Sequence, residues 1–196
     1  DYGLHCMSTD FPPGHEAELG DLLRMGVPSV KVYTTYRPNY YADDDVILRL
    51  LRASASGGLL VTVHAENDAL VTAAVGDLIS RGQTGWNYHG RSRPALAEQE
   101  AAHRALFLAE AVGAPAYIVH CSSAHTVELV QRARSRGLIA FAETCVQYLL
   151  LDDSKYNGEH PERYILQPPL RDKADVAALW RLIAEGAIST IATDHC

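Results

Sequence analysis

The sequence predicts a parallel α/β fold, and three observations lead to that prediction. Short apolar runs rich in β-branched residues alternate along the chain with longer amphipathic segments. Runs such as VKVY, LLVTVHA and AYIVHC are almost continuously apolar, which is typical of strands buried on both faces. The repeated order of strand then helix predicts right-handed crossovers between parallel strands. An open doubly wound sheet and a (β/α)8 barrel both fit this order.

The expected elements follow in chain order, and their ends carry suitable residues. Asp43, Asp44 and Asp45 suit a helix N-terminus, because carboxylates accept hydrogen bonds from its free N–H groups. Gly58 and Gly113 are suited to the ends of helices. The segment 152–163 is the most loop-like stretch. The expected strands are 2–6, 29–33, 59–65, 116–121, 138–143 and 189–192, and the expected helices are 14–25, 42–56, 67–81, 94–112, 124–136 and 173–184.

Composition excludes several classes of protein. The net charge of −7 argues against nucleic acid or an anionic membrane as the main partner, because both require a basic surface. No apolar run approaches the roughly 20 residues that span a bilayer, and no signal peptide is expected. The four cysteines form no C-x-x-C pair, so we expect a reduced, cytoplasmic protein rather than a disulfide framework.

Four residues with metal-binding or titratable side chains lie in, or just past, four different strands. They are Lys31 in SVKVY, His64 in VTVHAEN, His120 in YIVHCSS and Asp194 in TIATDHC. The carboxyl ends of parallel strands converge on one face of such a fold, so these side chains can meet. Imidazole and carboxylate are ligands of Zn²⁺ and similar ions. The positions therefore predict a metal site.

Each residue also has a structural explanation. A single histidine in a strand is more often a hydrogen-bonded core group than a metal ligand. Lys31 could be one partner of a buried ion pair, and Asp194 could cap the following segment. His195 could replace Asp194 as a ligand, and His5 could join the site. A metal site demands the same placement from four strands at once, which favours the functional interpretation.

At these residues the chain resembles the dihydropyrimidinase/hydantoinase branch of the amidohydrolase superfamily. The similarity runs from one end of the chain to the other, and the order and spacing of the motifs make it specific. The motifs are DYGLHC at 1–6, GVPSVKVYTTY at 26–36, VTVHAEN at 61–67, AYIVHCSSAHTVELV at 116–130, ETCVQYLLLD at 143–152, QPPLRDK at 167–173 and IATDHC at 191–196.

The resemblance implies a (β/α)8 TIM barrel with two divalent metal ions, usually Zn²⁺. The chain would supply barrel strands three to eight, without the first-strand H-x-H pair and without the C-terminal extension. Lys31 matches a lysine that CO₂ carboxylates and that bridges the two metals. A lysine in an apolar strand has a depressed pKa, so its neutral amine can take up CO₂. His64 and His120 match ligands of the second metal, and Asp194 matches a ligand that is also the general base.

The implied reaction is the hydrolytic opening of the cyclic amide of a dihydropyrimidine or hydantoin to an N-carbamoyl amino acid. Tyr36 matches a tyrosine that hydrogen-bonds the substrate carbonyl and steadies the oxyanion. Gln167 stands in a segment that contacts the ring amide and often carries serine in this family. Arg37, Tyr40 and Tyr41 surround Tyr36, so we expect an aromatic-lined entrance that tolerates a substituted hydantoin.

Other interpretations remain open at this point. An allantoinase or a dihydroorotase shares the metal scaffold and the reaction, and some relatives are metal-free scaffold proteins. The partner that the resemblance implies is a small cyclic amide, and family members are commonly homotetramers. Because a complete barrel needs about 250 residues, we expect the 196-residue chain by itself to be inactive and prone to aggregate.

Overall fold

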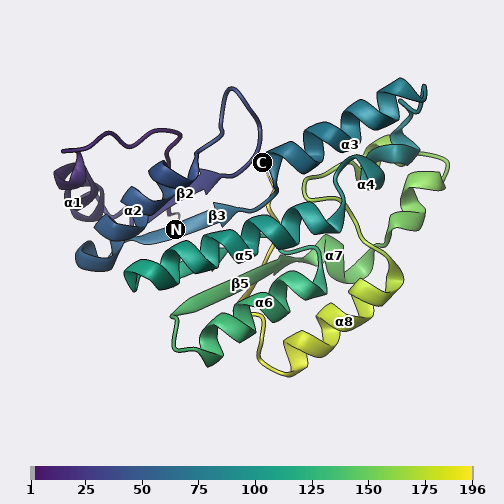
Figure 1. Cartoon of the computed structure of the whole chain (residues 1–196). Helices are drawn as coiled ribbons and strands as arrows, with labels where there is room; N and C mark the ends of the chain where they lie inside the picture. Colours follow the sequence, from purple (N-terminus) through teal and green to yellow (C-terminus); the bar gives the residue numbers. More distant parts are fainter. Residues whose placement is uncertain (1–2, 196) are drawn as a thin grey trace.

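The structure, a computed structural model, describes residues 3–195. Tyr2, where the first predicted strand begins, and Cys196 lie outside the described residues. The strands form one parallel six-stranded sheet whose order in space is their order in sequence (Figure 1). They are β1 (Cys6–Met7), β2 (Ser29–Tyr33), β3 (Leu60–His64), β4 (Ala116–Ile118), β5 (Ala140–Cys145) and β6 (Thr190–Ala192).

Helices connect the strands, and each long helix overlaps a range expected from the sequence. Asp43 caps the helix at residues 44–57 by accepting a hydrogen bond from the Val46 N–H at 2.9 Å. Gly58 ends this helix in the left-handed conformation. The long helices are α1 (Glu16–Arg24), α2 (Asp44–Gly57), α3 (Asp68–Ser80), α5 (Ala95–Val112), α6 (Ala124–Ser135) and α8 (Lys173–Ala184). The shorter ones are α4 (His89–Ser92), α7 (Val146–Leu150) and the 3₁₀ helices η1 (Trp86–Tyr88), η2 (Asp153–Asn157) and η3 (Pro161–Tyr164).

Several boundaries differ from the sequence predictions. Residues 3–5 are not in a strand, and β1 begins at Cys6, where it pairs with β2 on one side only. The strand expected to reach Cys121 ends at Ile118, because His120 has a φ of 40° and cannot continue an extended strand. The loop predicted at 152–163 contains η2 and η3. Helices α4 and α7 are too short to give a periodic signal in the sequence.

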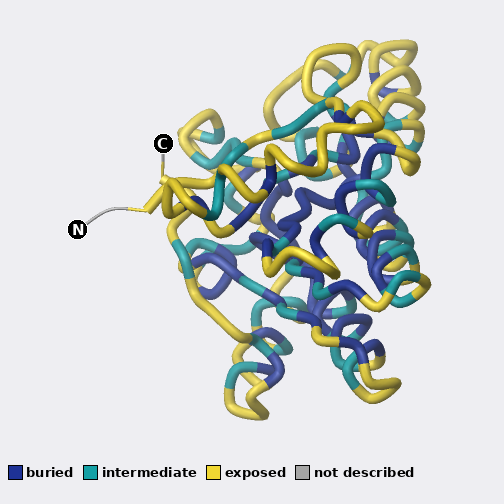
Figure 2. Tube along the Cα trace, turned by 90° about the vertical axis from the view of Figure 1, so that its left-hand side faces the viewer, coloured by how far each residue is buried: buried dark blue, intermediate teal, exposed yellow. Residues whose placement is uncertain are grey.

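The expectation of strands buried on both faces is confirmed for β3, in which residues 61–64 are all buried, but it is wrong for β2. Val30 and Val32 of β2 are buried on the face that α2, α5 and α6 cover (Figure 1). The alternate residues Lys31 and Tyr33 point to the opposite face and are only half-buried. Figure 2 shows the buried trace in the middle of the molecule and the exposed positions around it. One apolar face and one more polar face result.

The sheet is open in the described residues. Strands β1 and β6 stand at its two ends, and neither has a second neighbour there. The parallel α/β class is confirmed. The six described strands do not close into a barrel. No helix within residues 3–195 is both long and apolar enough to cross a membrane.

Candidate functional site

Two predicted metal ligands meet at the carboxyl ends of neighbouring strands. His64 is the last residue of β3, and His120 follows β4 by two residues. The Nδ1 atom of His64 lies 2.9 Å from Nε2 of His120, and the two rings meet edge to face. Each residue is only 2% exposed, so both imidazoles are withdrawn from water. The structure therefore places these two histidines side by side.

A buried carboxylate determines which ring nitrogen of His64 carries the proton. Glu66 Oε2 lies 2.8 Å from Nε2 of His64. Burial alone would raise the pKa of Glu66, but hydrogen bonds from His64 and Arg93 lower it to about 2. An ionised carboxylate only accepts hydrogen bonds, so His64 Nε2 is the donor. In neutral His64 the lone pair is then on Nδ1, the atom that faces His120.

His120 is held neutral and is incompletely bonded. Burial, followed by the charges of His64 and Lys31, lowers its pKa well below the usual value. Its Nδ1 atom is buried and has no hydrogen-bond partner among the described residues. A buried polar atom without a partner is costly in a folded protein. Two imidazoles whose nitrogens face one another are ligands that suit a divalent cation.

Lys31 lies on the same face of the sheet as this pair. Its β2 position is in register with Thr62, and Tyr33 is in register with His64. Side chains two residues apart in a strand share a face, so Lys31 and Thr62 lie beside Tyr33 and His64. The Lys31 Nζ atom is 5.4 Å from the centre of the Tyr33 ring. The structure thus places Lys31 on the face that carries His64, close enough to His120 for its charge to lower the pKa of that histidine.

Asp194 lies close enough to Tyr33 and Tyr36 for its charge to raise their pKa values. It follows β6, at the end of the sheet, and β5 separates that strand from β4. Within residues 3–195 no group of three or more His, Cys, Asp or Glu side chains is placed to hold a metal ion. Asp194 is exposed, although its charge is close enough to raise the pKa of Tyr33 after the larger effect of burial. The alternative ligand His195 is also exposed, and His5 is hydrogen-bonded to Ser29.

The two predicted substrate-binding residues contact each other directly. The Tyr36 hydroxyl donates a hydrogen bond of 2.7 Å to Oε1 of Gln167, across 131 residues of sequence. Burial is the main reason that the pKa of Tyr36 is raised, so the phenol stays protonated. The Tyr36 ring centre lies 5.0 Å from that of His64. The pair therefore lies directly beside the two histidines.

A pocket of about 760 Å³ opens beside this pair. The expected aromatic entrance is present in Tyr33, Tyr36 and Tyr40, but Tyr41 does not line it. The Tyr41 ring instead lies 3.6 Å below the Arg37 guanidinium and lines a neighbouring hollow. The lining residues are Met7, Tyr33, Tyr36, Arg37, Asn39, Tyr40 and Gln167.

Backbone strain is concentrated at predicted site residues. In the described part of the chain, the residues other than glycine with positive φ are Tyr36 (73°), His120 (40°) and Asp194 (50°). This conformation is uncommon for residues with a Cβ and persists where the surrounding structure imposes it. Such residues cluster at active sites. All three were selected from the sequence on other grounds.

A pair of buried, oppositely charged side chains next to the histidines was not predicted from the sequence. Glu66 is fully buried and Arg93 is 7% exposed, and they form a two-point ion pair. Glu66 belongs to the VTVHAEN motif, and Arg93 directly precedes Pro94. The available signal was an ionisable residue just after a buried strand. Its partner, 27 residues further on, could not be identified without the fold.

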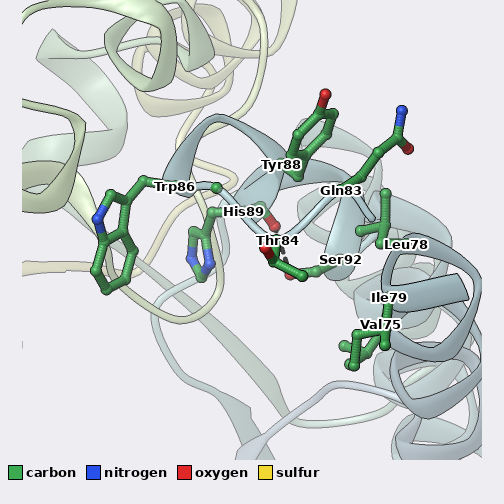
Figure 3. Close-up of a pocket in the computed structure, with 10 residues that line it drawn as sticks. Val75, Leu78, Ile79, Gln83, Thr84, Trp86, Tyr88, His89 and Ser92 are labelled. Carbon is green, nitrogen blue, oxygen red and sulfur yellow. Dashed lines mark hydrogen bonds between the residues drawn. The ribbon is translucent and has the colours of Figure 1, made fainter. Parts of the chain in front are cut away.

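A second pocket lies away from these residues, between the end of α3 and the segment 83–92 (Figure 3). Its volume is about 340 Å³. The aliphatic side chains Leu78 and Ile79 come from α3, while Trp86 and His89 come from the segment opposite. None of the predicted site residues lines it. His89 connects the two regions, because its Nε2 bonds the Leu166 carbonyl, next to Gln167, at 2.8 Å.

Several known proteins are similar to the whole of this chain. No protein-family model matches the chain. A D-hydantoinase from Streptomyces coelicolor is 40% identical over the whole chain, and a D-phenylhydantoinase from Escherichia coli is 39% identical. The crystal structure of a dihydropyrimidinase from Brevibacillus agri superposes on the whole chain with a TM-score of 0.96 at 35% identity. The chain spans 42–43% of the length of these relatives.

The fold and these similarities relate the chain to the cyclic amidohydrolases. Within that class, the relatives that match over the whole chain are D-hydantoinases and dihydropyrimidinases, so the chain is similar to part of a protein of that family. The resemblance seen in the sequence motifs is thereby confirmed.

Proposed function

We propose that the protein carrying this chain hydrolyses the cyclic amide bond of dihydropyrimidines or hydantoins and releases N-carbamoyl amino acids. The observation that carries the proposal is the pairing of His64 with His120 on the face of the sheet that carries Lys31, beside the bonded pair of Tyr36 and Gln167. The names of the relatives supply the substrate class. The chemistry of the side chains supplies the role of each residue.

Two divalent metal ions, Zn²⁺ in our proposal, would be held by Lys31, His64, His120 and Asp194. The facing imidazole nitrogens and the unpartnered Nδ1 atom of His120 fit such a group. Lys31 would act as its carboxylated form, which converts a cation into an anionic ligand that stays stable beside bound cations. When bound, the metal polarises the scissile carbonyl and lowers the pKa of water.

The remaining steps belong to side chains of this chain. Tyr36 stays protonated and donates its hydroxyl hydrogen to the substrate carbonyl oxygen, where negative charge develops. In the free protein this hydrogen is held by Gln167, so substrate exchanges one acceptor for another. Asp194 takes the proton of the attacking water and then passes it to the leaving ring nitrogen. Gln167 keeps the Tyr36 hydroxyl in place until substrate arrives.

The proposal is tested by kinetics on the full-length protein with dihydrouracil, hydantoin, allantoin and dihydroorotate. We expect turnover of dihydrouracil or hydantoin that is lost on treatment with a chelator and restored by Zn²⁺. Turnover of dihydroorotate or allantoin alone would show that another cyclic amidohydrolase activity is correct. A folded protein that binds no metal and turns over none of the four would support the scaffold interpretation.

We further propose that the protein works in the cytoplasm as a homo-oligomer, a tetramer by resemblance to its family. The net charge of −7 and the free cysteines among the described residues motivate the expectation of a small-molecule enzyme without nucleic-acid or membrane partners. Cys121 and Cys145 are buried free thiols, and burial raises the pKa of Cys145 to about 12.

A further inference from the structure

We propose that Glu66 and Arg93 are positioning residues that orient His64 and Tyr36 for the reaction. This inference rests on the proposed function and adds two residues to it. Neither side chain lines the pocket beside Tyr36. Both act through the residues they contact, Glu66 through a hydrogen bond and Arg93 through an ion pair and an aromatic ring.

The ion pair is rigid because of its geometry and burial. Arg93 directs Nε at one oxygen of Glu66 at 2.9 Å and Nη2 at the other at 2.7 Å. Such a two-point contact requires the planar fork of arginine, which lysine lacks. The side-chain exposure is 9% for Arg93 and 0% for Glu66. Little water therefore reaches the pair to compete for its hydrogen bonds.

Glu66 transmits this rigidity to His64. The carboxylate oxygen that accepts from Arg93 Nη2 is the same one that accepts from His64 Nε2. With Nε2–H bonded to a fixed acceptor, the ring cannot rotate and cannot move its proton to Nδ1. Outer carboxylates of this kind fix the tautomer of histidines that bind metals. The Nδ1 lone pair therefore stays directed at His120.

Arg93 also contacts the substrate-binding tyrosine. Its guanidinium carbon lies 5.1 Å from the centre of the Tyr36 ring, within the range of a cation–π contact. Arg93 is itself anchored, because its carbonyl oxygen accepts a 2.7 Å hydrogen bond from Nη1 of Arg171. One guanidinium thus links a metal-binding histidine to the hydroxyl-bearing ring that meets substrate. This link joins the strand end at 64–66 to the loop after β2.

A purely structural ion pair would stabilise the fold without affecting His64, and the chain contains a control of that kind. Glu98 and Arg171 are similarly buried, at 1% and 7% exposure, and are paired at 3.1 Å. Glu98 accepts hydrogen bonds from Ser122, Ser123 and Arg171. None of these bonds involves His64 or Tyr36. Glu98→Gln leaves unchanged the groups that form the bonds from Arg171 to Ser122 and to the Arg93 carbonyl oxygen, so we expect it to affect the fold and not His64.

The test measures zinc affinity by competition with a chelator, using the full-length protein. We expect Glu66→Gln to bind Zn²⁺ about 10–100-fold more weakly than wild type. Arg93→Lys should show a smaller loss, because it keeps the charge but not the fork. Glu98→Gln should stay within about twofold of wild type. At saturating Zn²⁺, Glu66→Gln should lower kcat and change KM by less than about twofold.

Removing one partner of a buried pair can prevent folding, so a double variant is included. Glu66→Gln combined with Arg93→Met removes both charges together and leaves no unpaired buried ion. It should fold and still bind Zn²⁺ weakly. Zinc affinity within twofold of wild type in this variant and in Glu66→Gln would overturn the inference, as would a wild-type protein that binds no Zn²⁺.

The same experiment separates this inference from the proposed function. Weakened zinc binding in the variants, together with no turnover of any cyclic amide by the wild type, would refute the function and support the positioning role. Unchanged zinc binding together with normal turnover would refute the positioning role and support the function.

Discussion

Tyr36 is the residue on which the candidate site depends most. Its backbone takes a positive φ of 73°, which costs a non-glycine residue on the order of 1–3 kcal/mol. The conformation directs the phenol toward Gln167 and places the ring 5.0 Å from that of His64. Glu66 is hydrogen-bonded to His64, and Arg93 contacts the Tyr36 ring. A buried, protonated hydroxyl beside two imidazoles is suited to donating a hydrogen bond to a developing oxyanion.

Replacing Tyr36 tests this role at the residue scale. Tyr36→Phe keeps the ring and its packing but removes the donor, so we expect kcat for the cyclic amide to fall about 100–1,000-fold. Circular dichroism and zinc content should match the wild type. Tyr164→Phe, in η3, removes a hydroxyl outside the pocket and serves as the control. A Tyr36→Phe variant with wild-type kcat would remove Tyr36 from the mechanism.

At the scale of elements, the site is built from the carboxyl ends of neighbouring strands. β2 contributes Lys31, and β3 contributes His64. The strands are held in place by helices packed on the opposite face, with α2 and α5 against each other and α6 against β5. The first turn of α2 follows the loop that carries Tyr36, so the stability of that turn affects the position of the pocket wall.

Asp43 provides a test of this coupling. Asp43→Ala removes the acceptor for the Val46 N–H and should destabilise the start of α2 by about 1 kcal/mol. Hydrogen exchange measured by mass spectrometry should be faster in the peptide that covers residues 43–50. Asp43→Asn keeps an acceptor and should exchange at close to the wild-type rate. Equal protection in the alanine variant would show that packing alone holds this turn.

At the scale of the whole molecule, the sheet has two unpaired edges in the described residues. β1 exposes Met7 and β6 exposes Ile191, each 49% exposed. Exposed apolar edge strands offer free N–H and C=O groups to other chains and favour association. The chain also spans only 42–43% of the length of its relatives. These observations motivate a prediction about the 196-residue chain by itself.

We expect the 196-residue chain to associate in solution, and we expect Ile191→Lys to reduce that association. A lysine on an edge strand opposes pairing with a second copy. Ile139→Lys changes another exposed isoleucine, one that lies outside the strands, and it should have a smaller effect. Static light scattering at several concentrations gives the measurement. Equal behaviour of the two variants would exclude the edge as the cause.

The alternation of strands and helices, the helix caps and the choice of candidate site residues could be predicted from the residues alone. These follow from local patterns: Asp43 caps a helix wherever that helix packs, and the order of motifs from Lys31 to Asp194 specifies the family. Only the tertiary structure decided which of these residues touch. The bond from Tyr36 to Gln167 spans 131 residues, and the pairing of Arg93 with Glu66 depends on how β3 and α5 pack. Asp194, chosen from the same pattern as His64, follows the end strand of the sheet, and its charge acts on Tyr33 and Tyr36 of the loop and strand beside His64. Local sequence encodes propensities, whereas contacts between distant residues arise only when the strands align and bury their helices.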